Sequence, residues 1–173
     1  MATRRALSTG VHTWVRCSRS EMPTLIEIFC PGEAVPAADI QAFLHEGVFF
    51  AAPPSVTLAA DAAAAPWTRI EIRYHARKRP VVVTCVRDEL EAFRDEVAAD
   101  VARVAPRERA RVARCVASAT HVVILEIDPA TATDEAWEMA DSLEGFIARS
   151  CHGVVHVSGE GFFDERLRPL SKT

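Results

Sequence analysis

The chain has 173 residues, of which 49% are hydrophobic and 25% are charged, and its formal net charge is -4. This composition excludes a wholly disordered chain and supports a single folded domain over residues 1–173. The small acidic excess argues against a nucleic-acid binder, whose footprint is strongly basic, and no segment approaches the ~20 apolar residues of a membrane span.

The cysteine pattern indicates a reducing compartment. The count is odd, the spacings are wide and no CxxC pair occurs, so a disulfide framework is not predicted and a cytoplasmic location is expected. Residues 1–20 carry basic but no acidic side chains, and they lack both the apolar stretch of a secretory signal and an obvious amphipathic transit helix. We expect them to be flexible or to form a short edge strand. The cysteines are Cys17, Cys30, Cys85, Cys115 and Cys151.

The chain then begins with an expected strand and helix. Residues 24–30 are rich in β-formers and stop at a Pro-Gly turn, which predicts a strand. Residues 36–46 have apolar side chains at helical spacing and end at Gly47, which predicts a short amphipathic helix. Residues 48–66 contain a Pro-Pro pair and an Ala-rich run, so we expect a long loop with a short strand at 56–58.

The middle of the chain reads as a hairpin followed by two helices. Strict apolar and polar alternation over residues 68–74 predicts a half-buried strand, and the apolar run 81–86 supplies its partner. Residues 88–104 return to helical spacing. Pro106 suits the first position of a second helix, since its missing N–H would have no partner there.

The C-terminal third predicts a strand, a long helix and a last strand. Residues 121–127 form an apolar run closed by an Asp-Pro pair. Thr133 is the expected N-cap of the helix, because its side-chain oxygen can accept a hydrogen bond from the first turn. Residues 153–157 are expected to be extended.

The order of elements between residues 24 and 127 is β-α-β-β-α-β. This order is typical of ferredoxin-like α+β folds, here with a doubled second helix and an added α-β unit at the C-terminus. By analogy we expect the helices on one face of a mixed sheet.

Three short patterns suggest chemistry and are better explained by structure. Cys151 and His152 are adjacent at a helix-to-strand junction, where a buried cysteine and a capping or surface histidine are expected instead of a nucleophile and its base. His152 and His156 lie four apart in an expected strand, roughly 13 Å from each other, which is too far to share one metal ion. Gly159 and Gly161 mark a turn, because no helix start follows to bind a phosphate. No catalytic residue, metal site or cofactor is therefore predicted, and an enzyme is disfavoured.

Acidic side chains concentrate on the last long predicted helix. Asp134, Glu138 and Asp141 recur at i, i+4 and i+7, which places them on one side of the helix. Glu135 and Glu144 flank this stripe. Such a face is either simply solvated or a docking surface for a basic partner, whose association complementary charge would accelerate.

An arginine stripe on the preceding predicted helix has the opposite charge. It could contact RNA or an acidic partner, or pair with acidic residues of the helix before it. The low net charge leaves no large basic excess, so pairing within the domain is favoured and nucleic acid is an improbable ligand. The arginines are Arg107, Arg111 and Arg114, and the acidic residues are Asp95, Glu96 and Asp100.

The C-terminal segments VVILEID, DEAW and GVVHVSGEGFFD carry a family resemblance. Over about residues 121–165 the chain resembles small uncharacterised bacterial α+β proteins, some of which are immunity partners of toxins. The resemblance implies stoichiometric protein binding and transfers no catalytic residue.

The sequence therefore favours a non-catalytic, cytoplasmic protein that binds a protein partner, most concretely an immunity-type protein that neutralises a toxin. Its contact surface would be the acidic helix face, and its oligomeric state stays open. One alternative is a small-ligand enzyme or sensor with a cleft near residues 48–66, where Arg73, Tyr74 and His75 would be the first candidates. Another is a structural subunit of a larger assembly.

Overall fold

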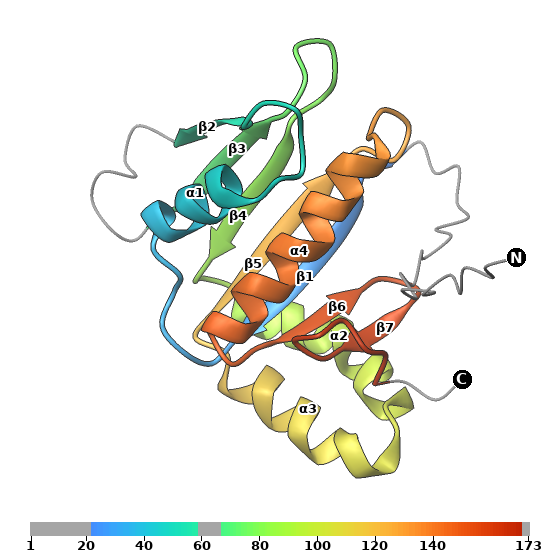
Figure 1. Ribbon diagram of the computed structural model, residues 1–173. Helices are drawn as coiled ribbons and strands as arrows, with labels where there is room; N and C mark the ends of the chain where they lie inside the picture. The colour runs from blue at the N-terminus through green and yellow to red at the C-terminus, as the bar shows by residue number, and fades with distance from the viewer. Residues whose placement is uncertain (1–21, 59–66, 171–173) are drawn as a thin grey trace, which may run out of the picture.

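A computed structural model of the chain describes residues 22–58 and 67–170, which build one seven-stranded sheet with helices on both of its faces (Figure 1). The expectations for residues 1–20 and for the Ala-rich part of the 48–66 loop lie outside the described residues. None of the four helices in the described part has the length and apolar character that a membrane crossing requires.

The predicted strands and helices are confirmed to within a few residues, including the short strand after the Pro-Pro pair. One strand was not predicted: β7 is only three residues long, and the sequence around Gly161 had been interpreted as a turn. The elements are β1 (Thr24–Cys30), α1 (Ala37–Glu46), β2 (Ser55–Leu58), β3 (Arg69–Arg73), β4 (Val81–Val86), α2 (Leu90–Arg103), α3 (Pro106–Ser118), β5 (His121–Ile127), α4 (Asp134–Ser150), β6 (Val154–Val157) and β7 (Gly161–Phe163).

The sheet has the strand order β2-β3-β4-β5-β1-β6-β7, and every neighbouring pair is antiparallel. The expectation of a mixed sheet is therefore wrong. Parallel strands do occur, but each such pair is separated by other strands: β1 and β2 are joined through α1, and β5 and β6 are joined through α4 across β1. The fold is α+β, with a sheet larger than a ferredoxin-like one.

The ferredoxin-like order β-α-β-β-α-β is not confirmed: β2 adds a third strand between α1 and α2, and the helix pair α2–α3 changes how the chain returns to the sheet. A single crossover helix carries the chain back to the end of the sheet where the preceding strand began, so the next strand runs parallel to it. Two antiparallel helices instead bring the chain back to the end at which it left. As a result β5 pairs directly and antiparallel with β4.

The expectation of helices on one face of the sheet is also wrong. Helices α1 and α4 cover one face, and Figure 1 shows α4 lying across the central strands. Helices α2 and α3 pack on the other face, where they contact β7, β1 and β6. The same helix pair explains this error. The ferredoxin-like analogy assumed a single crossover helix in place of α2 and α3, on the same face as the other helices.

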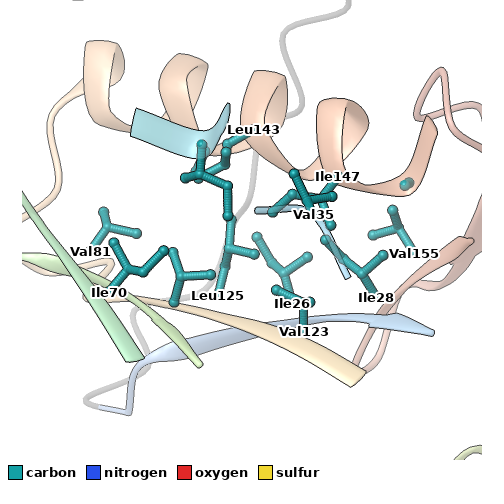
Figure 2. Packing of buried hydrophobic residues seen from close by; sticks show 14 of the residues in the cluster. Ile26, Ile28, Val35, Ile70, Val81, Val123, Leu125, Leu143, Ile147 and Val155 are labelled. Atoms are coloured by element: carbon teal, nitrogen blue, oxygen red, sulfur yellow. The ribbon is translucent and has the colours of Figure 1, made fainter. Parts of the chain in front are cut away.

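The larger part of the core lies between α4 and the sheet. In Figure 2, Leu143 and Ile147 of α4 project toward Ile26 and Ile28 of β1 and toward Leu125 of β5. All five are fully buried. Burying such a side chain contributes about 1.5–3 kcal/mol each, so this layer holds α4 firmly on the sheet.

The C-terminus of α4 is closed by a Schellman motif that needs one left-handed residue. The N–H of Gly153 donates to the Ala148 carbonyl at 2.8 Å, and His152 adopts φ 55° at the position where glycine is usual. The expectation of a buried cysteine and a capping surface histidine is confirmed here, since Cys151 is buried and His152 is exposed.

Two glycines at this end of the fold should respond to alanine with opposite signs. A Cβ on Gly153 would meet the Phe29 backbone oxygen at 2.5 Å, so Gly153→Ala should lower the free energy of unfolding by roughly 1–3 kcal/mol. In α4, the nearest neighbour of a Cβ on Gly145 is the end of the Arg149 side chain at 3.3 Å. Gly145→Ala should therefore be neutral or stabilising by up to about 1 kcal/mol. Urea unfolding of both variants checks this, and equal destabilisation would contradict it.

Candidate functional site

The predicted acidic stripe lies at the start of α4 and is mostly open to solvent. Asp134, Glu135 and Glu138 are exposed, and no ion pair involves them within the described residues. Thr133 caps the helix as expected, accepting a hydrogen bond from the Ala136 N–H at 3.3 Å. Hydrogen bonds from the Glu135 backbone and from Thr133 hold the pKa of the Glu135 carboxyl below its ordinary value. These three carboxyl groups are thus accessible from solvent.

Glu144 does not belong to this exposed face. Its side chain is only 3% exposed, whereas the sequence pattern had placed it at the edge of the stripe. The physical reason is the helical period: Glu144 lies one turn from Ala140, Ile147 and Ala148, which are all fully buried against the sheet. The exposed acidic face therefore ends at Asp141.

An open groove of about 410 Å³ begins where the acidic stripe ends. Asp141, Gly145 and Arg149 of α4 form one side of it, and they continue the row of Asp134 and Glu138 along the helix. The apolar lining comes from Phe43, Phe49 and Leu167, which belong to α1, to the loop after α1 and to the C-terminal turn. Charged side chains at the far end are Arg149, Glu165 and Arg166.

The groove walls are built by aromatic packing. The ring of Phe43 stacks on that of Phe146 at a centroid distance of 4.5 Å and lies 5.9 Å from the ring of Phe49. Val48, next to Phe49, is 97% exposed. Apolar side chains on this side of the molecule therefore face solvent beside an acidic helix.

The residues proposed for a small-ligand cleft are not brought together at this groove. Tyr74 stacks on Phe50 at 5.5 Å, and burial raises the pKa of its hydroxyl. His75 is exposed and accepts a hydrogen bond from the Arg77 N–H, while Arg73 is an exposed partner of Glu71. None of the three lines the groove.

The arginine stripe is partly neutralised within the domain, as expected, but by a different partner. Arg111 pairs with Glu165 of the C-terminal turn at 3.0 Å, and both Arg107 and Arg111 lie 3.8 Å from Glu108 of their own helix; neither carboxylate belongs to α2. Arg103 pairs with Asp100 of its own helix at 2.8 Å.

A buried histidine between two carboxylates is the main polar cluster that the sequence did not predict. His156 of β6 is 4% exposed, and its Nδ1 lies 2.9 Å from Glu27 Oε2 while its Nε2 lies 3.0 Å from Asp100 Oδ2. Glu27 is the direct cross-strand partner of His156 on β1, and Asp100 comes from α2. We call these residues the His156 cluster. It joins the sheet to the helix layer on the α2–α3 face.

The geometry suits a protonated imidazole. Each ring nitrogen faces a carboxylate oxygen, and only the imidazolium ion carries an N–H on both nitrogens. Burial by itself lowers the pKa of His156, but hydrogen bonds to Glu27 and Asp100 and their charges outweigh it, and the pKa lies above its ordinary value. Arg103 adds a second positive charge, so two cations balance two anions.

The contacts of the His156 cluster tie β6 to β1 and to α2. Both ring nitrogens are engaged, and the ring packs against Phe162 at a centroid distance of 4.8 Å. A general base needs a free nitrogen within reach of a substrate. Within the described residues, no group of three or more His, Cys, Asp or Glu side chains is placed to hold a metal ion.

One sequence signal could have found this cluster. Glu27 is the only charged residue in the strand TLIEIFC, and His156 is the only polar residue in VVHV. Charged or polar side chains inside central strands require partners, so the two are natural candidates to pair. The two residues are 129 positions apart in the sequence, and nothing local indicates that their strands are neighbours.

No protein-family model, no curated protein and no solved structure matches the chain.

The His156 cluster should make stability depend on pH. Because the folded-state pKa of His156 is raised above its ordinary 6.5, its stabilisation is fully present below about pH 6.5 and is lost as pH rises through the folded pKa. His156→Gln should cost about 3–5 kcal/mol near pH 6, since it leaves the largely buried Glu27 carboxylate without its cationic partner, and the cost should shrink at high pH.

Urea unfolding of wild type and His156→Gln, at set pH values between 5.5 and 9, measures this difference in the free energy of unfolding. His45→Gln, a change at an exposed position of α1, is the matched control and should follow the wild-type profile. Parallel profiles for wild type and His156→Gln would show that the histidine is not a charged partner in the fold.

Proposed function

We propose that this protein acts in the cytoplasm as a non-catalytic binder of another protein, and specifically as an immunity-type protein that neutralises a toxin by stoichiometric binding. The observation that carries the proposal is the continuous row on α4 that leads from exposed carboxylates into an apolar groove. We call this row and the groove the α4 docking face; it comprises Asp134, Glu138, Asp141, Phe43, Phe49 and Leu167.

The acidic part and the groove of the α4 docking face would contribute to binding in different ways. Asp134 and Glu138, which are exposed and have no ion pair within the described residues, attract a basic surface and accelerate its encounter. The groove then offers a place for an apolar side chain, because Phe43, Phe49 and Leu167 form its lining. A few such anchored side chains usually supply most of the affinity in a protein interface.

The charge distribution also predicts how the partner is oriented. Asp134 and Glu138 lie at one end of the α4 docking face, and Arg149 and Arg166 lie at the other. A matching partner is basic opposite the start of α4 and presents an apolar side chain to the groove. The core holds α4 rigidly, and a preorganised surface loses little entropy when a partner binds.

Charge reversal on α4 should distinguish a docking surface from a helix face that is merely solvated. Asp134→Lys combined with Glu138→Lys should weaken binding to the partner by about tenfold or more, mainly through a slower association rate. The wild-type affinity should fall as salt is raised, and the variant should lose most of that dependence. Binding is measured by titration calorimetry against the purified product of each neighbouring gene, and protection from growth arrest is scored on co-expression.

The matched control places the same charge changes on the opposite face of the sheet. Glu91 and Asp95 are exposed on α2, so Glu91→Lys with Asp95→Lys alters net charge equally and should leave binding unchanged. Equal losses of affinity in both variants would show that net charge alone causes the effect. A tight small molecule that raises the melting temperature, without any protein partner, would replace this proposal with ligand sensing.

A further inference from the structure

Two buried cysteines that are far apart in the sequence lie in direct contact. Cys30 is the last residue of β1 and Cys151 is the C-cap of α4, and their Sγ atoms are 2.6 Å apart. Both side chains are fully buried. Among the four described cysteines, Cys85 and Cys115 make no such sulfur–sulfur contact, and Cys115 instead points its thiol at the Phe29 carbonyl at 3.5 Å.

The backbone around the pair holds the two sulfurs in place. The Gly32 N–H donates to the Cys151 carbonyl at 3.0 Å, and the Thr120 N–H donates to the Cys30 carbonyl at 2.9 Å. Both neighbouring glycines are needed for this approach: a Cβ on Gly32 would meet the Cys151 oxygen at 2.8 Å, and one on Gly153 would meet Cys151 Sγ at 2.9 Å. The contact is thus built from β1, β5 and the end of α4 together.

We propose that Cys30 and Cys151 are an oxidative modification site, at which a peroxide converts the two thiols into an intramolecular disulfide. The site goes beyond the proposed partner binding and does not rest on it. Its consequence is a covalent link between the end of β1 and the end of α4, which closes a loop between residues 121 apart in the sequence.

The chemistry assigns a different role to each sulfur. The Cys151 thiolate attacks one peroxide oxygen, which breaks the O–O bond and leaves a sulfenic acid and hydroxide. The Cys30 sulfur then attacks Cys151 Sγ and displaces the sulfenic oxygen as water. Two thiols lose two electrons and two protons in total, and one hydrogen peroxide becomes two water molecules.

The surroundings favour Cys151 as the attacking sulfur. Its contact with Cys30, aided by the Gly153 backbone, holds the pKa of Cys151 below its ordinary value despite burial. The same contact and burial raise the pKa of Cys30. Because both sulfurs are buried, the oxidant must reach them through a brief local opening of the fold.

The test is peptide mapping of the full chain after graded hydrogen peroxide, with remaining thiols alkylated under denaturing conditions. Cys17→Ser, at a position outside the described residues, is used as the background to suppress links between molecules. We expect two thiols to disappear together, a single peptide linking residues 30 and 151, and reversal by dithiothreitol. The oxidised protein should melt about 5 °C or more above the reduced one, since the bond constrains the unfolded chain.

Matched variants assign the sulfurs. Cys85→Ala and Cys115→Ala remove other buried thiols and should keep the 30–151 link. Cys30→Ser, whose hydroxyl keeps a donor beside Cys151, should leave a Cys151 sulfenic acid that dimedone traps, and Cys151→Ala should leave Cys30 as a thiol. If these variants fail to fold, the peptide map of the Cys17→Ser protein still decides the matter.

Three results would overturn the site. One is a dominant link that involves Cys85 or Cys115. Another is oxidation of Cys151 to a sulfinic acid while Cys30 remains a thiol. The third is that both sulfurs stay reduced at a peroxide concentration that oxidises Cys17 in the wild-type chain.

Discussion

A carboxylate inside an interior strand of the sheet constrains the whole fold. Strand β1 pairs with β5 and β6 and is covered by helices on both faces, so Glu27 would be costly to bury without compensation. His156 meets it from the neighbouring strand, and Asp100 and Arg103 complete the charge balance from α2. A slip of one residue between β1 and β6 would turn His156 to the opposite face. Strand register and helix docking are therefore coupled through one imidazole.

The α4 docking face lies over the other face of the sheet. On the α2–α3 side, the His156 cluster and the apolar layer around Phe29 and Phe162 close the structure. On the α1–α4 side, the apolar face of α4 is buried, while its outer row carries carboxylates and borders the groove. The end of α4 is tied to β1 at Cys151, and its acidic start is exposed. One helix thus combines a fixed anchor with a charged surface.

The limits of the sequence-based fold prediction follow from the range of the interactions. The alternation in β3 and the proline that opens α3 are local signals, and both elements are found where expected. Strand β7 was missed because three residues have no period of their own and become a strand only by pairing with β6. The analogy with a single crossover failed because α2 and α3 act as a pair. Which face a helix covers depends on where its connection ends, which no local pattern encodes.

The candidate site divides in the same way between local and distant causes. Helical spacing alone places Asp134, Glu138 and Asp141 in one row, because 3.6 residues per turn is a property of the backbone. The burial of Glu144, the groove that brings Phe43 beside Leu167, and the partners of His156 were settled by packing between segments that are distant in the sequence. Periodicity reports which side chains share a face, whereas the free energy of burying them depends on what the rest of the chain brings against that face.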